Sequence, residues 1–242
     1  MSPKKITHFS FVYKFKKDSD LDISSLYEKF EKVNSYLGKF RIEKIPVPDS
    51  APDEIPRIIM KSNNLEIIFS KSSIQIAFNY NDTENLGNLR DNEVEIKRLS
   101  SLFVSQDLNI QTHLDWIGVV IKGIVLKEDP NKSLNIIKDE IYNEFDLSES
   151  KNDFRVLIHQ EKNSEVIEAE GTIFQNLFNL NLEVGTHPRK KGSKDEQVGI
   201  FYSVDNNTRY LKGVPYNSDF LEKMIRDTSN YFDSGFLVEN VD

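Results

Sequence analysis

Apolar and polar residues alternate in the first clearly patterned segment of the sequence, residues 6–16. Alternation over this length predicts a β-strand with one face in the core and the other turned towards solvent. The core face would carry Phe9, Phe11, Tyr13 and Phe15, and the other face Ser10, Val12 and Lys14.

The pattern changes to helical spacing over residues 24–37. Ser25 and Glu28 fit a capping box at the start of this helix, and Gly38 is a typical stop signal. The same criteria predict further helices at 91–105, 131–145 and 218–232. They predict strands at 40–45, 57–62, 65–70, 74–80, 113–127, 154–161 and 197–205, and one bent strand or two short ones within 165–184.

These elements follow one order twice, because each half has a strand, a helix, about four antiparallel strands and a second helix. Aligning the first helices of the two halves pairs Leu26 with Leu134 and Val33 with Ile141. The predicted fold class is therefore α+β, with two β-α-β4-α units at residues 1–109 and 110–242. The two units would share one curved antiparallel sheet, with the helices on one face, and form one compact globular protein.

Two resemblances follow from these features. The repeated β-α-β4-α order resembles the duplicated fold of TATA-binding proteins, in which two such units form a saddle-shaped sheet. The sequence also resembles a sporadically distributed family of uncharacterised bacterial proteins, on the 65–80 hairpin, the segment Trp116-Ile-Gly-Val-Val120, the segment 199–205 and the closing 218–232 helix. That family brings no established activity, so the resemblance implies a fold and an accessory or regulatory setting in a bacterium, in a mobile or defence locus.

Composition narrows the classes of protein further. Hydrophobic residues make up 38% of the 242 residues, which is enough for a sizeable core and excludes disorder for most of the chain. The sequence lacks an apolar run long enough for a membrane span, and its start does not match a signal peptide. Cys is absent, which excludes disulfides, thiolate metal sites and Cys nucleophiles and suits a cytoplasmic location.

The net charge of −8 argues against a nucleic-acid-binding protein, since such proteins usually carry a basic excess that neutralises phosphates. Residues 1–110 are balanced, and the acidic excess lies in residues 111–242. One basic segment, with Arg189, Lys190, Lys191 and Lys194, lies between two predicted strands. It is either a solvated hairpin loop or a contact for phosphates or an acidic partner.

Enzyme chemistry has little support in the sequence. It contains no nucleotide-binding glycine motif, nucleophile elbow or zinc-protease motif. His113 with Asp115, and His159 with Glu161, are each two residues apart on a predicted strand and would share a face. Such a pair could orient a general base or begin a metal site, but a surface ion pair or a histidine at a strand end explains it better. We therefore assign no catalytic residue, metal or cofactor, and leave enzyme activity open.

The sequence thus favours a non-enzymatic interaction protein that binds a partner protein on the sheet face opposite the helices. Candidate contact residues on that face are Ser10, Lys14, Gln75 and Asn79, which alternate with core positions. The alternatives are a nucleic-acid-binding protein that uses a saddle-shaped sheet and the 189–194 loop, and an enzyme with a His–carboxylate site. Residues 113–127 alternate little, which predicts a strand buried on both faces with Trp116 in the core.

Overall fold

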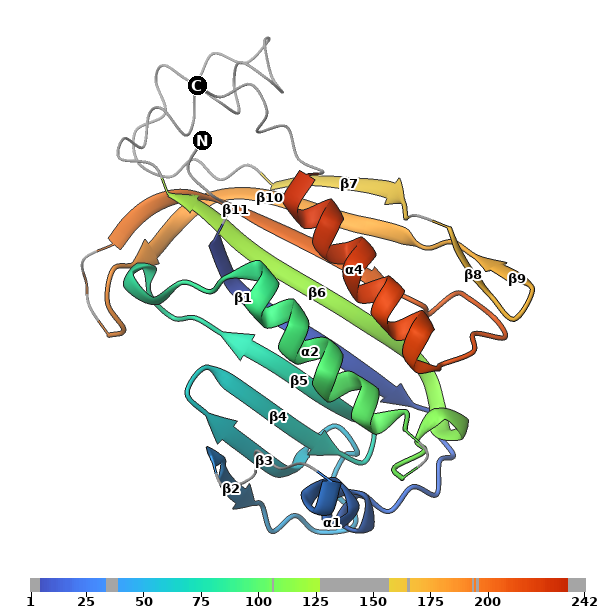
Figure 1. Ribbon diagram of the computed structural model, residues 1–242. Coiled ribbons are helices and arrows are strands. Elements are labelled where there is room, and N and C mark those ends of the chain that lie inside the picture. Colours follow the sequence, from blue (N-terminus) through green and yellow to red (C-terminus); the bar gives the residue numbers. More distant parts are fainter. Residues whose placement is uncertain are drawn as a thin grey trace.

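The computed structural model describes residues 5–33, 39–105, 107–126, 157–164, 166–192, 194 and 196–234. They form an α+β fold around one nine-stranded antiparallel sheet, which Figure 1 shows from its helix-covered side. The strands lie in the order β2-β3-β4-β5-β1-β6-β11-β10-β7. A separate two-stranded hairpin, β8–β9, projects from one side of the sheet (Figure 1).

The N-terminal part of the chain builds one side of the sheet, outward from β1. Its elements are β1 (Lys5–Phe15), α1 (Ile23–Val33), β2 (Arg41–Lys44), β3 (Pro56–Ser62), β4 (Leu65–Ser70), β5 (Ser73–Asn79) and α2 (Leu89–Phe103). Asn63, at a positive φ of 49°, makes the tight turn between β3 and β4. Asp22 caps α1, since its carboxylate accepts a hydrogen bond from the Ser24 N–H. The cap is therefore Asp22 and not the predicted Ser25.

The C-terminal part builds the other side, outward from β6. Its elements are β6 (Leu114–Leu126), β7 (Leu157–Asn163), β8 (Ile167–Ala169), β9 (Thr172–Phe174), β10 (Leu177–Pro188), β11 (Glu196–Asn207) and α4 (Ser218–Ser234). The segment 165–184 therefore holds two short strands and the start of a long one, because Glu170 and Gly171 turn the chain at positive φ. The predicted helix at 131–145 lies outside the described residues.

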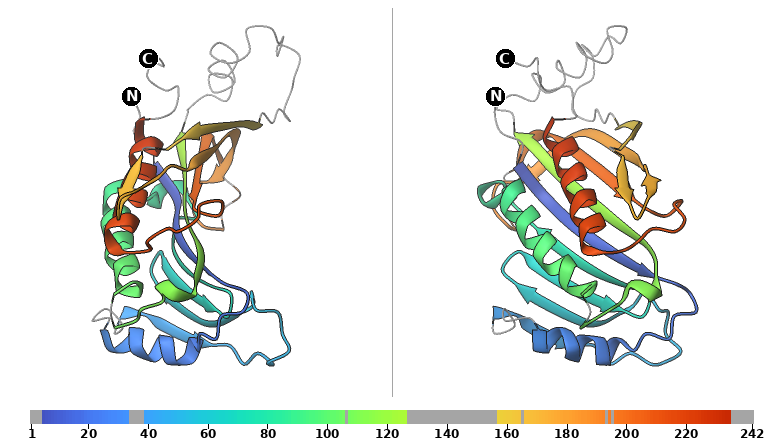
Figure 2. Two further views of the ribbon diagram at one scale, coloured as in Figure 1. Left: turned by 90° about the vertical axis from the view of Figure 1, so that its right-hand side faces the viewer. Right: turned by 45° about the vertical axis from the view of Figure 1, so that its right-hand side comes forward.

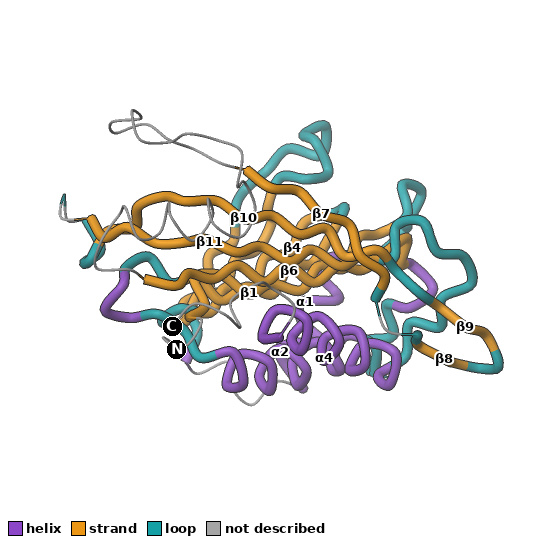
Figure 3. Tube along the Cα trace, turned by 90° about the horizontal axis from the view of Figure 1, so that it is seen from above, coloured by secondary structure: helices purple, strands orange, loops and turns teal. Residues whose placement is uncertain are grey.

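β1 and β6 pair antiparallel at the centre of the sheet and join the two parts into one layer. Helices α1, α2 and α4 all lie on one face of this layer, as Figure 3 shows from above. The sheet curves along its length. The left view of Figure 2 shows the sheet from its edge, with the helices on one side of it and the opposite face on the other. Among the residues that the structure describes, no helix lies on that second face, which we call the open face.

The core lies between the sheet and the three helices, where strand alternation and helix stripes meet. Phe103 of α2 stacks on Phe30 of α1 at 4.8 Å between ring centroids, and Phe69 of β4 meets both rings edge-on. The ring centroid of Tyr13 in β1 lies 5.6 Å from that of Phe103, and the Tyr13 hydroxyl donates to the Ser100 carbonyl. The aromatic positions of 6–16 therefore pack where their alternation predicts.

Trp116 differs from its prediction. It lies on the open face of β6 in register with Lys14 and is half-buried beneath the Arg209 guanidinium, 4.8 Å from its ring centroid. β6 has one core face, and its open face carries the exposed Asp115 and Lys122.

A separate finding concerns the helices of the described residues, none of which has the length and apolar character to cross a membrane.

Candidate functional site

The four predicted contact residues lie on the open face, on the two neighbouring strands β1 and β5. Cross-strand pairing places Ser10 opposite Ala77, and Lys14 opposite Ser73. Gln75 and Asn79 alternate with Ile74 and Ile76, which are fully buried on the helix side. The structure therefore brings the four residues to one side of the sheet, with Ser10 buried and the other three partly exposed, although it does not test whether they bind a partner.

A hydrogen-bonded chain links three polar side chains of this face. His8 of β1 lies directly opposite Asn79 of β5, and its Nδ1 is 2.7 Å from Asn79 Oδ1. Because that oxygen only accepts, Nδ1 carries the proton. His8 Nε2 then accepts the hydroxyl proton of Ser10, whose Oγ lies 2.9 Å away. Burial lowers the pKa of His8, the Asn79 hydrogen bond opposes this, and the Lys122 charge adds to the lowering, so the neutral imidazole is favoured.

The order hydroxyl, imidazole and amide is also the order of a nucleophile, its base and an orienting group. Ser10, however, is only 2% exposed, since it lies between larger neighbours on the sheet. A nucleophile must reach the substrate carbonyl, and this hydroxyl is not presented to solvent. We interpret the chain from Ser10 to Asn79 as a polar centre of the open face, because both ring nitrogens of His8 are hydrogen-bonded within it.

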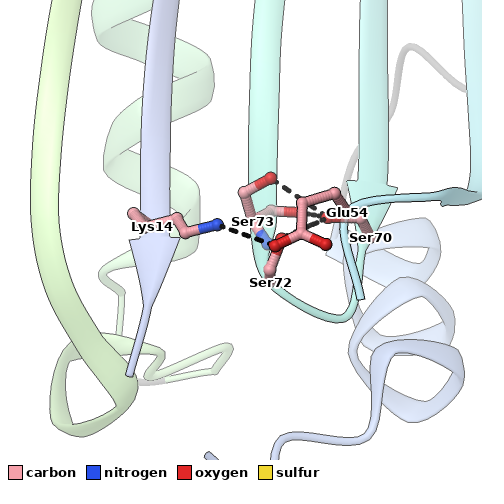
Figure 4. A network of polar contacts seen from close by, with 5 residues as sticks. All are labelled: Lys14, Glu54, Ser70, Ser72 and Ser73. Carbon is pink, nitrogen blue, oxygen red and sulfur yellow. Dashed lines mark hydrogen bonds and ion pairs between the residues drawn. The ribbon is translucent and has the colours of Figure 1, made fainter. Parts of the chain in front are cut away.

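Lys14 lies at the end of β1, beside a cluster of serines in the β4–β5 turn (Figure 4). Ser70 Oγ accepts from the Ser73 N–H at 3.0 Å and also lies 3.0 Å from the Ser73 hydroxyl. Lys14 Nζ points across this turn towards Glu54, whose Oε1 is 3.9 Å away (Figure 4). The Glu54 side chain is 71% exposed, so this ion pair contributes little stability and leaves Lys14 available for another anion.

A second polar area of the open face lies on β6, β11 and β10. Pairing places Lys122 opposite Ser203, and Ser203 opposite Asn181, in the row that begins with Asn79 and His8. Lys122, Ser203 and Asn181 line a hollow of about 390 Å³. Phe201 and Glu183, which pair with each other in the adjacent row, also line it. The open face therefore offers hydrogen-bonding groups over five neighbouring strands, with an aromatic ring beside them.

A larger groove of about 810 Å³ lies at the end of the sheet. It is lined by the end of β1, the 16–22 segment, the start of α1 and the proline-rich 46–56 loop. Arg57 holds that loop in place, since its Nη1 donates to the carbonyls of Val47 at 2.9 Å and Pro48 at 3.3 Å. The sequence alone did not single out Arg57, because it is one cation among many and its bonds form only in the fold.

The structure places only one of the two predicted His–carboxylate pairs differently from its prediction, and it leaves the chemistry of both untested. His113 lies on a short 3-10 helix (Gln111–His113), not on the strand, and its Nδ1 is 3.0 Å from Ser19 Oγ and 3.5 Å from Asp20 Oδ1. Asp115 follows on β6 and is exposed. His159 and Glu161 do share β7, but the side chain of His159 lies outside what the structure describes. No group of three or more His, Asp or Glu side chains that could hold a metal occurs in the part of the chain that the structure describes.

The basic 189–194 segment forms the β10–β11 hairpin loop, as predicted, but it contacts another loop. The Lys191 N–H donates to Asp82 Oδ2 at 3.2 Å, and Lys190 Nζ lies 3.6 Å from Glu84 Oε1. The Glu84 N–H also donates to the Arg189 carbonyl at 3.3 Å. Part of the positive charge therefore faces carboxylates of this same chain, which weakens the case for phosphate binding.

The sequence did not single out His8 and Lys122, although both lie in the central polar row. His8 precedes the aromatic positions and lies on the same side of β1 as Ser10, opposite Asn79 of β5. An available signal was the spacing of His8 and Ser10, two residues apart on a strand, which places both on one face. Asn79, 71 positions later, becomes their partner only through the pairing of β1 with β5.

Comparison with known proteins adds no functional assignment. The sequence matches no protein-family model, and no curated protein matches it. The candidate site therefore rests on the geometry of the open face and of the groove beside it.

Proposed function

We propose that this chain is a non-enzymatic interaction protein that binds a segment of a partner protein on the open face of its sheet. The observation that supports this most is the contrast between the two faces. Three helices cover one face, while the described residues of the other face present a continuous row of polar side chains from β5 to β10. An antiparallel sheet can leave one face in water, which makes that face accessible to a partner.

The chemistry of the face favours a protein over a nucleic acid. Lys14 and Lys122 share it with Asp205 and Glu183, so charges of both signs are present. Phosphate backbones require a surplus of positive charge, whereas protein surfaces offer donors, acceptors and charges of both signs. Phe201 and Trp116 add aromatic area, which is typical of protein contacts.

The experiment places a photo-crosslinking amino acid at Gln75 or Asn179 of the full chain, both on the open face. A matched variant carries it at Val94 of α2, which is 67% exposed on the outer side of the helix layer. We expect both open-face positions, but not Val94, to crosslink to the same protein in the native host. That protein is then purified and titrated against the unmodified chain by calorimetry.

Substitutions of single residues on the open face complete the test. Gln75→Arg and Ser203→Arg add bulk and charge to half-buried positions of the open face, and each should weaken binding of the purified partner about tenfold or more. Lys97→Glu on α2 should leave the affinity unchanged. Equal crosslinking at Val94, or no effect of the two arginine substitutions on affinity, would contradict the proposal.

We further propose that the two halves are copies of one β-α-β4-α unit, arranged as in the TATA-binding-protein fold. Supporting this, the strands follow from β1 as β5, β4, β3 and β2, and from β6 as β11, β10 and β7. Each half also ends in a helix on the same face, α2 and α4 (Figure 3). Superposition of the halves, cut near residue 109, over about seventy residues tests the idea, and a different strand order in a high-resolution structure would refute it.

We propose that the chain acts as an accessory protein in a bacterial cytoplasm. Fractionation of the native host, with an antibody to detect the chain in each fraction, tests this location. The absence of Cys from the sequence supports a reducing compartment. Recovery with secreted or envelope proteins would contradict this location.

A further inference from the structure

The guanidinium group of Arg57 is only half satisfied by the protein. Its Nη1 donates to two carbonyls of the 46–56 loop, whereas Nε and Nη2 are buried and have no hydrogen-bond partner among the described residues. A buried donor on a charged group that lacks a partner costs free energy, and folded proteins nearly always pair such groups. The Nε–Nη2 edge of Arg57 therefore lacks an acceptor among the residues that the structure describes.

The geometry of that edge selects the kind of acceptor. Nε and Nη2 carry parallel N–H bonds, which match two oxygens of one carboxylate or one phosphate group. Nη1 is already used to hold the loop, so the free edge is the one suited to a bidentate oxyanion. A water molecule would offer this edge one oxygen rather than two and would bring no compensating charge.

The surroundings of Arg57 fit a small ligand with negative charge. The groove of about 810 Å³ lies within the range of small-molecule sites. Lys14 and Arg57 are half-buried in its lining, whereas every carboxylate of the lining is exposed. Charges that are shielded from water interact more strongly than exposed ones, so these two cations should act more strongly on a bound anion than any single exposed carboxylate does.

The 46–56 loop places two of its own carboxylates near cations of this groove. Glu54 lies 3.9 Å from Lys14, and Asp49 lies 3.9 Å from Lys71. Both acids are exposed, Glu54 at 71% and Asp49 at 105% of the side chain, so neither pair is tight. A ligand anion that enters the groove would compete with these carboxylates for the same lysines.

We propose that the groove binds a small molecule through an oxyanion, a carboxylate or a phosphate, which takes the Nε–Nη2 edge of Arg57 and displaces Glu54 from Lys14. Because the two nitrogens are covered in the structure, binding requires a local movement that uncovers them. The site lies at the end of the sheet and does not depend on the open face having a protein partner.

The first experiment titrates the ¹⁵N-labelled full chain with inorganic phosphate and, separately, with acetate, and follows the arginine Nε–Hε signals by NMR. Arg209, which stacks on Trp116, is the internal control. We expect a saturable shift at Arg57 and not at Arg209 with at least one anion, and the better anion identifies the chemical class. Shifts that grow without saturation and equally at both arginines would overturn the proposal, since they report ionic strength alone.

Substitutions sharpen the result. Arg57→Lys keeps the charge but removes the two-oxygen edge, and it should weaken anion binding about tenfold. Because this change could also loosen the loop, the second variant leaves Arg57 intact. Glu54→Gln with Asp49→Asn removes the competing carboxylates and should tighten binding several-fold. Glu66→Gln, which alters a carboxylate paired with Lys61 outside the groove, is the control and should have no effect. Weaker binding in the double variant would contradict the proposal.

Discussion

The two faces of the central sheet use the same strands for different purposes. On β6, Ile117, Val119 and Ile121 are fully buried beneath the helices, while Asp115 and Lys122 of the same strand are exposed on the open face. One face therefore supplies most of the apolar burial that stabilises the fold. The other face contributes less to stability, so its residues are free to be chosen for binding. The predictions below test this division, from the largest expected effect to the smallest.

Phe103→Ala should have the largest effect, because this ring lies at the centre of the aromatic cluster on the covered face. It is fully buried and contacts Phe30, Phe69 and Tyr13. Its removal should lower the free energy of unfolding by about 3–5 kcal/mol in urea denaturation. Gln75→Ala on the open face should change it by less than about 0.5 kcal/mol. Equal losses for the two variants would show that the open face also belongs to the core.

Two glycines of β6 give a matched comparison on one strand. A Cβ at Gly123 would face the Phe232 ring and lie 2.6 Å from the Lys5 carbonyl on the crowded side. Gly123→Ala should therefore lower the free energy of unfolding by about 1–3 kcal/mol. At Gly118, on the open face, the nearest atom is Trp116 Cζ3 at 3.2 Å, so Gly118→Ala should cost less than about 1 kcal/mol. A larger loss at Gly118 than at Gly123 would contradict the assignment of faces.

The pH dependence of stability tests the polar centre of the open face. The pKa of His8 is lowered in the folded state by burial, so the unfolded chain binds the proton more readily. The contribution of neutral His8 is therefore complete above about pH 6.5 and is lost as the pH falls below that value. Urea denaturation between about pH 5 and pH 8 should show a smaller acid destabilisation for His8→Gln than for the wild type.

Lys122→Met refines this test, because the Lys122 charge also contributes to the lower pKa of His8. Its removal should shift the acid destabilisation in the same direction as His8→Gln, but by less. An acid response that is identical in the wild type and in both variants would show that other groups dominate the pH dependence.

Neutralising the 189–194 loop should have the smallest effect. Replacement of Arg189, Lys190, Lys191 and Lys194 by Gln removes the exposed ion pair of Lys190 with Glu84 but keeps the hydrogen bond from the Lys191 backbone N–H to Asp82, so stability should change by less than about 1 kcal/mol. Fluorescence anisotropy with duplex and single-stranded DNA and RNA at about 0.15 M salt should show little binding before or after the change. Sub-micromolar binding that depends on this loop would favour the nucleic-acid alternative over a protein partner.

The sequence by itself determined the positions of most helices and strands. β4 begins and ends at the predicted residues, and β1, β6, α2 and α4 lie within about two residues of their predictions. This succeeds because alternation and helical periodicity are local properties, set by which side of each element faces apolar material. The assignment of Gln75 and Asn79 to a face away from the core follows from the same periodicity.

Only the tertiary structure decided which residues meet. The pairing of β1 with both β5 and β6 brings His8 to Asn79 and places Trp116 on the open face beside Lys14, although all of these lie far apart in the sequence. The 46–56 loop likewise folds back on Arg57 and leaves one edge of its guanidinium group unpaired. Such contacts depend on strand order and register, which the amphipathic pattern of one segment does not encode, because many pairings bury the same apolar face.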